Sequence, residues 1–336
     1  MGLSKLKFGV EFVPMNPYWK TTLLAMESER SGFDNVWITD HYNNRNVYVS
    51  LTLAALHTEK IKLGPGVTNP YMIHPVMTAQ AVASLNEIAP GRVVCGIGVG
   101  DKTTLGTVGI ESQTPLAAIR DSVQIIRDMT SGKGSQLEGK AFRVSGARFF
   151  FNVGNPIPVY VGAQGPKMLS LAGEIGDGVL INASHRRDIE NALKFVKEGV
   201  TRGGRTMDKV DVAVYASFSM AEDPAKAVKA ATPVVAYIAA GAPPPLLESH
   251  GISVQAAESI KNGIAQGKWK EAFGQVTSEM IDAFSICGTP ETCLERIEEL
   301  GKIGMTQFVA GSPLGPKVRG SIRTFGERII PSLKHD

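Results

Sequence analysis

The sequence predicts an α/β protein built as a (β/α)8 TIM barrel with insertions. Three features of its 336 residues favour this fold: apolar segments of strand length alternate with helical patterns, eight such segments occur, and glycine or polar residues directly follow most of them. An open doubly wound sheet is the alternative, because it shows the same alternation. A barrel places the carboxyl ends of its strands on one face, so the residues that follow the strands should line one ligand-binding mouth.

The first 130 residues contain four strand patterns and four helix patterns. Leu6, Phe8, Val10 and Phe12 alternate with polar or small residues, and this period of two is typical of a strand. Glycine, proline and polar residues separate the later segments, as expected at element boundaries. The predicted strands are 6–12, 35–39, 61–67 and 92–97, and the predicted helices are 18–31, 47–58, 74–88 and 115–130.

The third of these strands is unusual because Gly64-Pro65-Gly66 interrupts it. Proline removes a donor from the strand ladder, and glycine allows another group to approach the backbone closely. Two interpretations stay open. The segment forms a bulge whose backbone touches a flat ligand, or it is a tight loop before the helix that starts near His74.

The alternation resumes after residues 131–156, which are rich in glycine and polar residues and should contain a short hairpin. A second insertion, made of short helices, is expected at 241–284. We therefore predict a single barrel domain over residues 1–336 with insertions near these two segments. The remaining predicted strands are 157–161, 178–181, 210–220 and 306–310, and the remaining helices are 167–175, 188–201, 224–240, 290–303 and a last one through 330.

The composition is that of an ordinary globular protein, with 43% hydrophobic and 20% charged residues and a formal net charge of +3. No basic stripe indicates nucleic acid, and no apolar run is long enough for a membrane span. Three cysteines without CxxC spacing argue against a disulfide framework or a structural zinc site. The six histidines show no HxxxH or HExxH spacing, so no metal site is expected. These features predict a cytoplasmic protein.

Functional candidates follow the predicted strands, where a barrel would gather them at its mouth. We expect the following residues there: Glu11, Asp40, His41, Gly66, Val67, Thr68, Gly98, Val99, Gly100, Asp101, Gly162, Ala163, Gln164, Gly165, Asn182 and Ser312.

Two carboxylates in this set are candidates for chemistry. Glu11 lies on an inward strand face with small neighbours, where poor solvation would keep it protonated to higher pH and make it a general acid. An ion pair between Glu11 and Lys7 or an arginine is the alternative. Asp101 follows Gly98-Val99-Gly100 and either bonds a cofactor ring edge or caps a turn. This GxGxD run lacks the remaining parts of a dinucleotide fingerprint.

The segment Gly162-Ala163-Gln164-Gly165 stands between a strand and a helix. Backbone N–H groups at a helix start bind phosphate, and barrels often bind phosphate at this position. A close-packed turn would need the same residue types, so that interpretation stays open.

Several of these motifs together resemble one enzyme family, the 5,10-methylenetetrahydromethanopterin reductases of methanogenic and related archaea. These belong to the bacterial-luciferase-like flavin and deazaflavin barrels. The similarity extends over essentially the whole chain, and the combination of motifs is more specific than any one of them. The motifs are KFGVEFVP at 7–14, WITDHYNN at 37–44, LGPGVTNPY at 63–71, GAQGP at 162–166, LINA at 180–183 and VAGSPLGP at 309–316.

The resemblance implies a single luciferase-like (β/α)8 barrel that binds coenzyme F420, an 8-hydroxy-5-deazaflavin. It also implies a non-prolyl cis peptide at Gly66-Val67 in the third strand, behind the deazaflavin ring. Glu11 and Asp101 are the catalytic candidates under this resemblance. The cofactor-binding candidates are Asp40, His41, Gly66, Val67, Thr68, Gly98, Val99, Gly162, Ala163, Gln164, Gly165 and Asn182.

The implied reaction is the reversible, F420-dependent reduction of 5,10-methylenetetrahydromethanopterin to the 5-methyl compound, in methanogenesis or its reverse. Glu11 would protonate the bridging nitrogen, and the iminium ion formed on ring opening would accept hydride. The resemblance further implies a homodimer or homotetramer and a pterin partner, tetrahydromethanopterin or its tetrahydrosarcinapterin analogue. Two alternatives are another enzyme of the group, such as an FMN monooxygenase or a deazaflavin alcohol dehydrogenase, and a flavin-binding barrel without catalysis.

Overall fold

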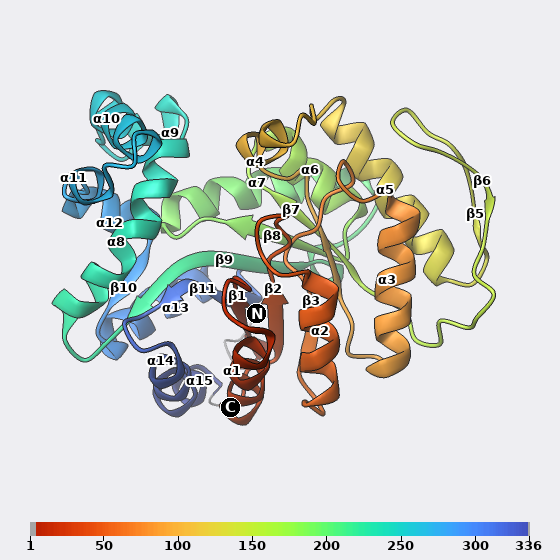
Figure 1. Ribbon diagram of the computed structural model, residues 1–336, viewed down its shortest axis with the longest axis horizontal. Helices are drawn as coiled ribbons and strands as arrows, with labels where there is room; N and C mark the ends of the chain where they lie inside the picture. Colours follow the sequence, from red (N-terminus) through yellow and green to blue (C-terminus); the bar gives the residue numbers. More distant parts are fainter. Residues whose placement is uncertain (1–4, 335–336) are drawn as a thin grey trace. The chain divides into compact units, whose positions relative to one another are not determined.

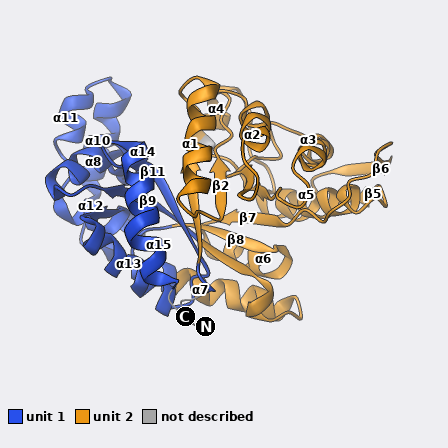
Figure 2. Cartoon of the chain, turned by 90° about the horizontal axis from the view of Figure 1, so that it is seen from below, with its two compact units in different colours: residues 1–6, 183–190, 214–336 blue, residues 7–182, 191–213 orange. Residues whose placement is uncertain are grey.

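The computed structural model describes residues 5–334, in which strands and helices alternate along the chain (Figure 1). The predicted fold class is confirmed, since the strands and helices form a (β/α)8 barrel with insertions. Residues 5–334 form two compact units (Figure 2): unit 2 comprises 7–182 and 191–213, and unit 1 comprises 5–6, 183–190 and 214–334. The single-domain description stays a prediction. No helix within 5–334 has both the length and the apolar character needed to cross a bilayer.

Unit 2 holds the first part of the barrel and the predicted hairpin. Its strands are β1 (Lys7–Phe12), β2 (Asn35–Ile38), β3 (Lys62–Pro65), β4 (Cys95–Ile97), β5 (Ser135–Glu138), β6 (Arg143–Ala147), β7 (Val159–Ala163) and β8 (Gly178–Asn182). Its helices are α1 (Tyr18–Arg30), α2 (Val47–Leu56), α3 (Pro75–Ile88), α4 (Lys102–Thr107), α5 (Pro115–Thr130), α6 (Pro166–Ile175), most of α7 (Arg186–Arg202) and the short 3-10 helix Met207–Lys209.

Parallel pairing aligns the carboxyl ends of the strands in unit 2. β1 pairs with β2 and β2 with β3, so that Ile38 stands opposite Pro65. β4 pairs with β7 and β7 with β8, so that Gly162 stands opposite Leu180. A bridge between Leu63 and Val93 joins β3 to the chain just before β4. The carboxyl ends of these strands therefore point the same way, as the sequence predicts.

Glu29, at the end of α1, fixes the start of β3. Its Oε1 accepts the backbone N–H groups of Lys60 and Ile61 at 2.6 and 2.8 Å, and that of Glu59 at 2.9 Å. Burial opposes ionisation of this carboxyl, but the three N–H groups together with Arg92 hold the pKa of Glu29 below its usual value. One charged side chain thus anchors the backbone where the third strand begins.

The structure differs from the predicted elements at several places in unit 2. The β5–β6 hairpin is confirmed, and the regular part of β3 ends at Pro65 instead of Val67. The helix α4 was not predicted, because its six residues contain three threonines and a glycine, which are poor helix formers. The side chain of Asp101 caps this helix.

Unit 1 holds the rest of the barrel and the helical insertion. Most of the long strand β9 (Asp211–Met220) lies in it, and the other strands are β10 (Ile286–Gly288) and β11 (Gln307–Leu314). The short β10, which pairs with β9, was not predicted. The helices are α8 (Pro224–Gly241), α9 (Pro244–Ser249), α10 (Val254–Ala265), α11 (Trp269–Phe273), α12 (Ser278–Phe284), α13 (Pro290–Lys302), α14 (Val318–Thr324), a π-helical turn (Phe325–Ile329) and α15 (Ile330–Leu333).

The insertion is packed, and the short helices expected at 241–284 are confirmed as α9 to α12. Val235, Ile260 and Phe284 belong to one buried apolar cluster built by α8, α10 and α12. Elsewhere in unit 1 the rings of Phe218 and Phe308 meet edge to face, with centroids 5.8 Å apart. Each part of unit 1 therefore has apolar packing of its own.

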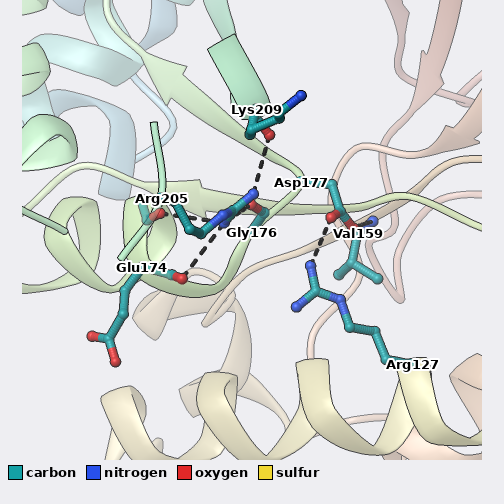
Figure 3. Close-up of polar contacts among 8 residues, drawn as sticks. Arg127, Val159, Glu174, Gly176, Asp177, Arg205 and Lys209 are labelled. Carbon is teal, nitrogen blue, oxygen red and sulfur yellow. Dashed lines mark hydrogen bonds and ion pairs between the residues drawn. The ribbon is translucent and has the colours of Figure 1, made fainter. Parts of the chain in front are cut away.

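Arg205 joins several carbonyl groups at the amino-terminal side of β7 and β8 (Figure 3). Its Nη1 donates to the carbonyl oxygen of Gly176 at 2.6 Å, and its Nη2 donates to that of Lys209 at 3.1 Å. Close by, Arg127 pairs with Asp177 at 2.8 Å, and Asp177 accepts the N–H of Val159. These contacts satisfy the carbonyl of Gly176 after α6, the carbonyl of Lys209 before β9 and the N–H of Val159 at the start of β7.

We expect Arg205→Ala to lower the free energy of unfolding by about 2 kcal/mol, because it leaves half-buried carbonyls without their charged donor. Arg205→Lys should recover only part of this loss. A lysine ammonium group lacks the forked guanidinium geometry that lets Arg205 donate to the carbonyls of Gly176 and Lys209 at once. Urea denaturation measures the effect. Arg202→Ala is the matched control, because Arg202 makes only a 3.8 Å ion pair with Glu174 from an exposed side chain. Equal losses in the two alanine variants would contradict the assigned role of Arg205.

Candidate functional site

The ends of β2, β3 and β4 meet around the residues that follow Pro65. The N–H of Gly66 donates to the carbonyl of Ile38 at 2.8 Å, and the N–H of Thr68 donates to that of Gly96 at 3.0 Å. The carbonyl of Thr68 accepts the N–H of Gly98 at 2.9 Å. The irregular segment after β3 is therefore hydrogen-bonded to a neighbouring strand end on each side, as expected of a bulge.

The peptide between Gly66 and Val67 is cis, as the resemblance implies. Glycines in or just after β4 and in β7 lie close to the Val67 side chain. A Cβ added at Gly98 would lie 2.8 Å from Cγ2 of Val67, and one at Gly162 would lie 3.3 Å from Cγ1. A Cβ at Gly96 would be 3.2 Å from the same Cγ1. A side chain at Gly98 would therefore force Val67 to shift, and side chains at Gly96 and Gly162 would crowd it.

Glu11 is buried in β1, with 7% of its surface exposed, next to Trp37 in the register of β1 and β2. The predicted shelter from solvent is confirmed. Lys7, which the sequence allowed as a partner of Glu11, instead pairs with Asp211 at 3.0 Å. The role of Glu11 as an acid stays a prediction.

Asp40 and His41 follow β2, and both are half-buried. Burial raises the pKa of the Asp40 carboxyl, and the neighbouring Thr68 hydroxyl and His41 only partly offset this. The hydroxyls of Tyr48 and Thr78 are also buried near that of Thr68, without regular hydrogen-bond geometry. Sequence reasoning missed Tyr48 and Thr78, because nothing in a helical pattern distinguishes a hydroxyl that faces the strand ends.

Replacing Asp40 by asparagine should stabilise the protein at neutral pH. A carboxyl whose pKa is raised by folding binds a proton more tightly in the folded chain, so stability falls as pH rises from its ordinary pKa of 3.8 through the folded value. Asparagine cannot ionise, so the Asp40→Asn variant does not lose this stability as pH rises. Melting temperatures measured from about pH 3 to about pH 7 should therefore show Asp40→Asn gaining on the wild type as pH rises. A difference that stays constant over this range would contradict the raised pKa.

Asp101 is exposed and acts as the N-cap of α4. Its Oδ1 accepts the N–H of Thr104 at 2.8 Å and the Thr104 hydroxyl at 2.9 Å. This is the capping alternative left open by the sequence. Its catalytic role stays a prediction, as does the cofactor contact of Val99, which is half-buried between Gly98 and the cap.

The segment from Gly162 to Gly165 leads from β7 into α6, and Gly165 is the N-cap of that helix. No side chain caps α6, Gln164 and Gly165 are exposed, and a Cβ added at Gly165 would meet nothing within 4 Å. Ala163 is buried. The first N–H groups of α6 thus adjoin open space, a favourable arrangement for binding an anion.

Two further residues of the expected mouth lie apart from this cluster in the sequence. Asn182 is exposed at the end of β8. Ser312 lies in β11 of unit 1, where its carbonyl accepts the Ser217 hydroxyl at 3.2 Å. Every other predicted site residue belongs to unit 2.

A hollow of about 650 Å³ in unit 2 lies at the other end of these strands. Pro158, which precedes β7, and Asp177, which precedes β8, contribute to its lining together with Arg127. Residues at the amino-terminal end of barrel strands serve mainly stability, so this hollow is separate from the candidate site.

Comparison with known proteins gives consistent matches over nearly the whole chain. The family model described as luciferase-like monooxygenase matches residues 11–307. The chain is 51% identical over 333 residues to 5,10-methylenetetrahydromethanopterin reductase of Archaeoglobus fulgidus, covering 98% of this chain and 100% of that protein. It is 49% identical over 326 residues to the reductase of Methanolobus tindarius, covering 97% of this chain and 100% of that protein.

Solved structures agree with these matches. The structure of coenzyme F420-dependent tetrahydromethanopterin reductase from Methanopyrus kandleri superposes with a TM-score of 0.93 at 42% identity, covering 98% of this chain and 99% of that one. An F420-dependent secondary alcohol dehydrogenase, at 22% identity and a TM-score of 0.81, shares the fold and covers both chains completely. The chain therefore belongs to the luciferase-like monooxygenase family, and within it to the 5,10-methylenetetrahydromethanopterin reductases.

Proposed function

We propose that this protein catalyses the reversible reduction of 5,10-methylenetetrahydromethanopterin to the 5-methyl compound, with coenzyme F420 as hydride carrier. The observation that carries the proposal is the identity of 51% over 98% of the chain to a reductase of this name. The site in unit 2 supports it, because it combines a buried carboxylic acid, a backbone segment held between strands and an uncapped helix start. The tetrahydrosarcinapterin analogue is a substrate of the same class.

The residues present fit a deazaflavin cofactor. The Gly66–Val67 backbone is half-buried and held from behind by the packing of Val67, so it offers a firm surface to a flat ring. The half-buried Asp40 and His41 would supply polar groups beside it, and the buried hydroxyl of Thr68 lies next to Asp40. The N–H groups at the start of α6, with Gly162, Ala163, Gln164 and Gly165 leading into them, would hold the phosphate of the side chain. Gly98 and Val99 continue the surface along the next strand end.

Within this site the protein contributes position and one proton. When bound, the deazaflavin supplies the hydride. Glu11 holds its proton in a place sheltered from water and donates it to the bridging nitrogen of the pterin, which prepares the methylene carbon to accept hydride. Asn182, exposed at the end of β8, and Asp101 are the further polar groups that would contact the bound molecules.

Anaerobic spectroscopy tests the proposal directly. Mixing the protein with reduced F420 and methylenetetrahydromethanopterin should restore the absorbance of the oxidised deazaflavin with multiple turnovers. Reduced F420 with acetone should give no turnover, and in a separate aerobic assay reduced FMN with dioxygen should give no oxygenated product. Activity only with acetone would indicate a deazaflavin alcohol dehydrogenase, and transfer of oxygen from dioxygen to an organic substrate with reduced FMN would indicate a monooxygenase. Cofactor binding without any turnover would indicate a barrel that has lost catalysis.

We further propose that the enzyme works in the cytoplasm as a homodimer or homotetramer. The three cysteines are free, two of them buried, as expected for a chain that folds in a reducing compartment. Light scattering coupled to gel filtration would give the oligomeric state, and a monomer would contradict that part of the proposal.

A further inference from the structure

Three side chains with metal-binding atoms converge in unit 1, and none of them is among the predicted active-site residues. His185 lies between β8 and α7, Asp188 lies in the first turn of α7, and His250 follows α9. Nε2 of His250 is 2.9 Å from Oδ2 of Asp188, and one ligand atom from each of the three residues lies within 4.8 Å of the others. The His250 side chain is only 5% exposed and that of Asp188 20%.

We propose that His185, Asp188 and His250 bind one divalent transition-metal ion, with zinc as the preferred metal. Two imidazole nitrogens and one carboxylate oxygen form a donor set typical of zinc sites. Ligand atoms around a tetrahedral zinc ion lie about 3.3 Å apart, given bond lengths of about 2.0 Å. The separations in unit 1 span this value, so a rotation of the half-buried His185 ring completes the set.

The surroundings hold His250 and leave His185 adjustable. The His250 ring meets the ring of His185 at 4.7 Å and that of Phe284 at 6.0 Å, both nearly edge to face. Nδ1 of His185 accepts the N–H of Arg187 at 3.2 Å. Metal binding through Nε2 requires a proton on Nδ1, so this long hydrogen bond has to break. The ion would also replace the hydrogen bond of 2.9 Å between Nε2 of His250 and Oδ2 of Asp188, so loading the site costs both hydrogen bonds.

Two nearby guanidinium groups have partners, and an ion pair offsets the charge of one of them, Arg296. The Arg187 guanidinium donates to the carbonyl oxygen of Ser249, and Arg296 pairs with Asp282 at 2.7 Å. Three protein ligands leave a fourth position for water. The ion would fasten the helical insertion at α9 to the start of α7 and act as a structural clip. This role does not depend on the proposed reductase activity.

Metal titration of the full-length chain, without a histidine tag and after treatment with a chelator, tests the proposal. We expect one equivalent of zinc to bind with a Kd of about 1 μM or tighter, and to raise the melting temperature. Cobalt should give the visible absorption bands of a low-symmetry site. His250→Gln and His185→Gln should each abolish the high-affinity binding. Asp188→Asn keeps the side-chain volume and an oxygen acceptor, and it should weaken zinc binding strongly. This variant tests the site independently if a histidine variant folds poorly.

His57→Gln is the matched control, since the exposed side chain of His57 contacts the carbonyl of Leu53 in the preceding helix α2. It should bind zinc like the wild type. Absence of saturable zinc binding, or binding that survives all three site variants, would overturn the proposal. Reductase assays in chelator report separately on the proposed function, so the failure of either proposal is recognisable.

Discussion

Replacing Glu11 by glutamine is expected to lower kcat for pterin reduction by about a hundredfold or more, which is the usual contribution of a positioned general acid. Glutamine has the same shape as glutamate and can still form hydrogen bonds, but it cannot donate the required proton. The F420 dissociation constant should change by no more than a few fold, because Glu11 is assigned to the substrate and not to the cofactor. Steady-state kinetics with reduced F420, together with fluorescence titration of the cofactor, measure both quantities.

Asp101→Asn separates the two catalytic candidates. Asparagine is an equally good N-cap, so this variant keeps the contact with Thr104 and the helix α4. If Asp101 only caps α4, kcat stays near that of the wild type, whereas a large loss would give Asp101 a part in the reaction. A Glu11→Gln enzyme that turns over within a few fold of the wild type would remove Glu11 from the acid role.

Gly98→Ala is expected to weaken F420 binding by about tenfold or more, because the new methyl group would lie 2.8 Å from Cγ2 of Val67. Overpacking of this kind costs about 1–3 kcal/mol, which is a factor of about ten or more in a binding constant when it falls on the binding segment. The displaced part would be the Gly66–Val67 backbone, which supports the proposed ring site. Fluorescence titration with F420 and urea denaturation would measure the two effects.

A double-mutant cycle makes this prediction specific. Val67→Ala removes the methyl groups that the new side chain would meet, so the Gly98→Ala, Val67→Ala double variant should bind F420 better than Gly98→Ala alone. Gly106→Ala is the control, because a Cβ there would meet nothing within 4 Å. If the losses of F420 affinity from Gly98→Ala and Val67→Ala were additive, the methyl group added at position 98 would not be in steric conflict with Val67.

The barrel, and the placement of most candidate site residues at its strand ends, were predictable from the sequence because both depend on local patterns. Alternating apolar residues such as Phe8 and Val10 mark a strand wherever it occurs, and the residue after a parallel strand must lie at its carboxyl end. The positions of Asp40 and Gly66 therefore followed from strand assignments alone. The cis peptide at Gly66-Val67 came instead from the resemblance of the motif to a known family.

What could not be predicted depends on contacts between distant residues. His185 and His250 stand 65 positions apart, so no spacing rule connects them, and only the folded chain places both beside Asp188. The role of Gly98 in making room for Val67 likewise appears only when β4 lies next to the segment after β3. For Lys7, the sequence offered Glu11 as a nearby partner, but Asp211 pairs with it from 204 positions away.

The carboxylate of Glu29 has a consequence at the far end of the strand that it anchors. By accepting the N–H groups of Lys60 and Ile61, it fixes the register of β3, and so the number of residues between this anchor and the carboxyl end of the strand. Side chains on a strand alternate between faces, so a shift of one position would turn Val67 away from the glycines that accommodate it. Deleting or inserting a single residue between Ile61 and Gly66 would thus change which side chains face the candidate site. The amino-acid composition of the segment would hardly change.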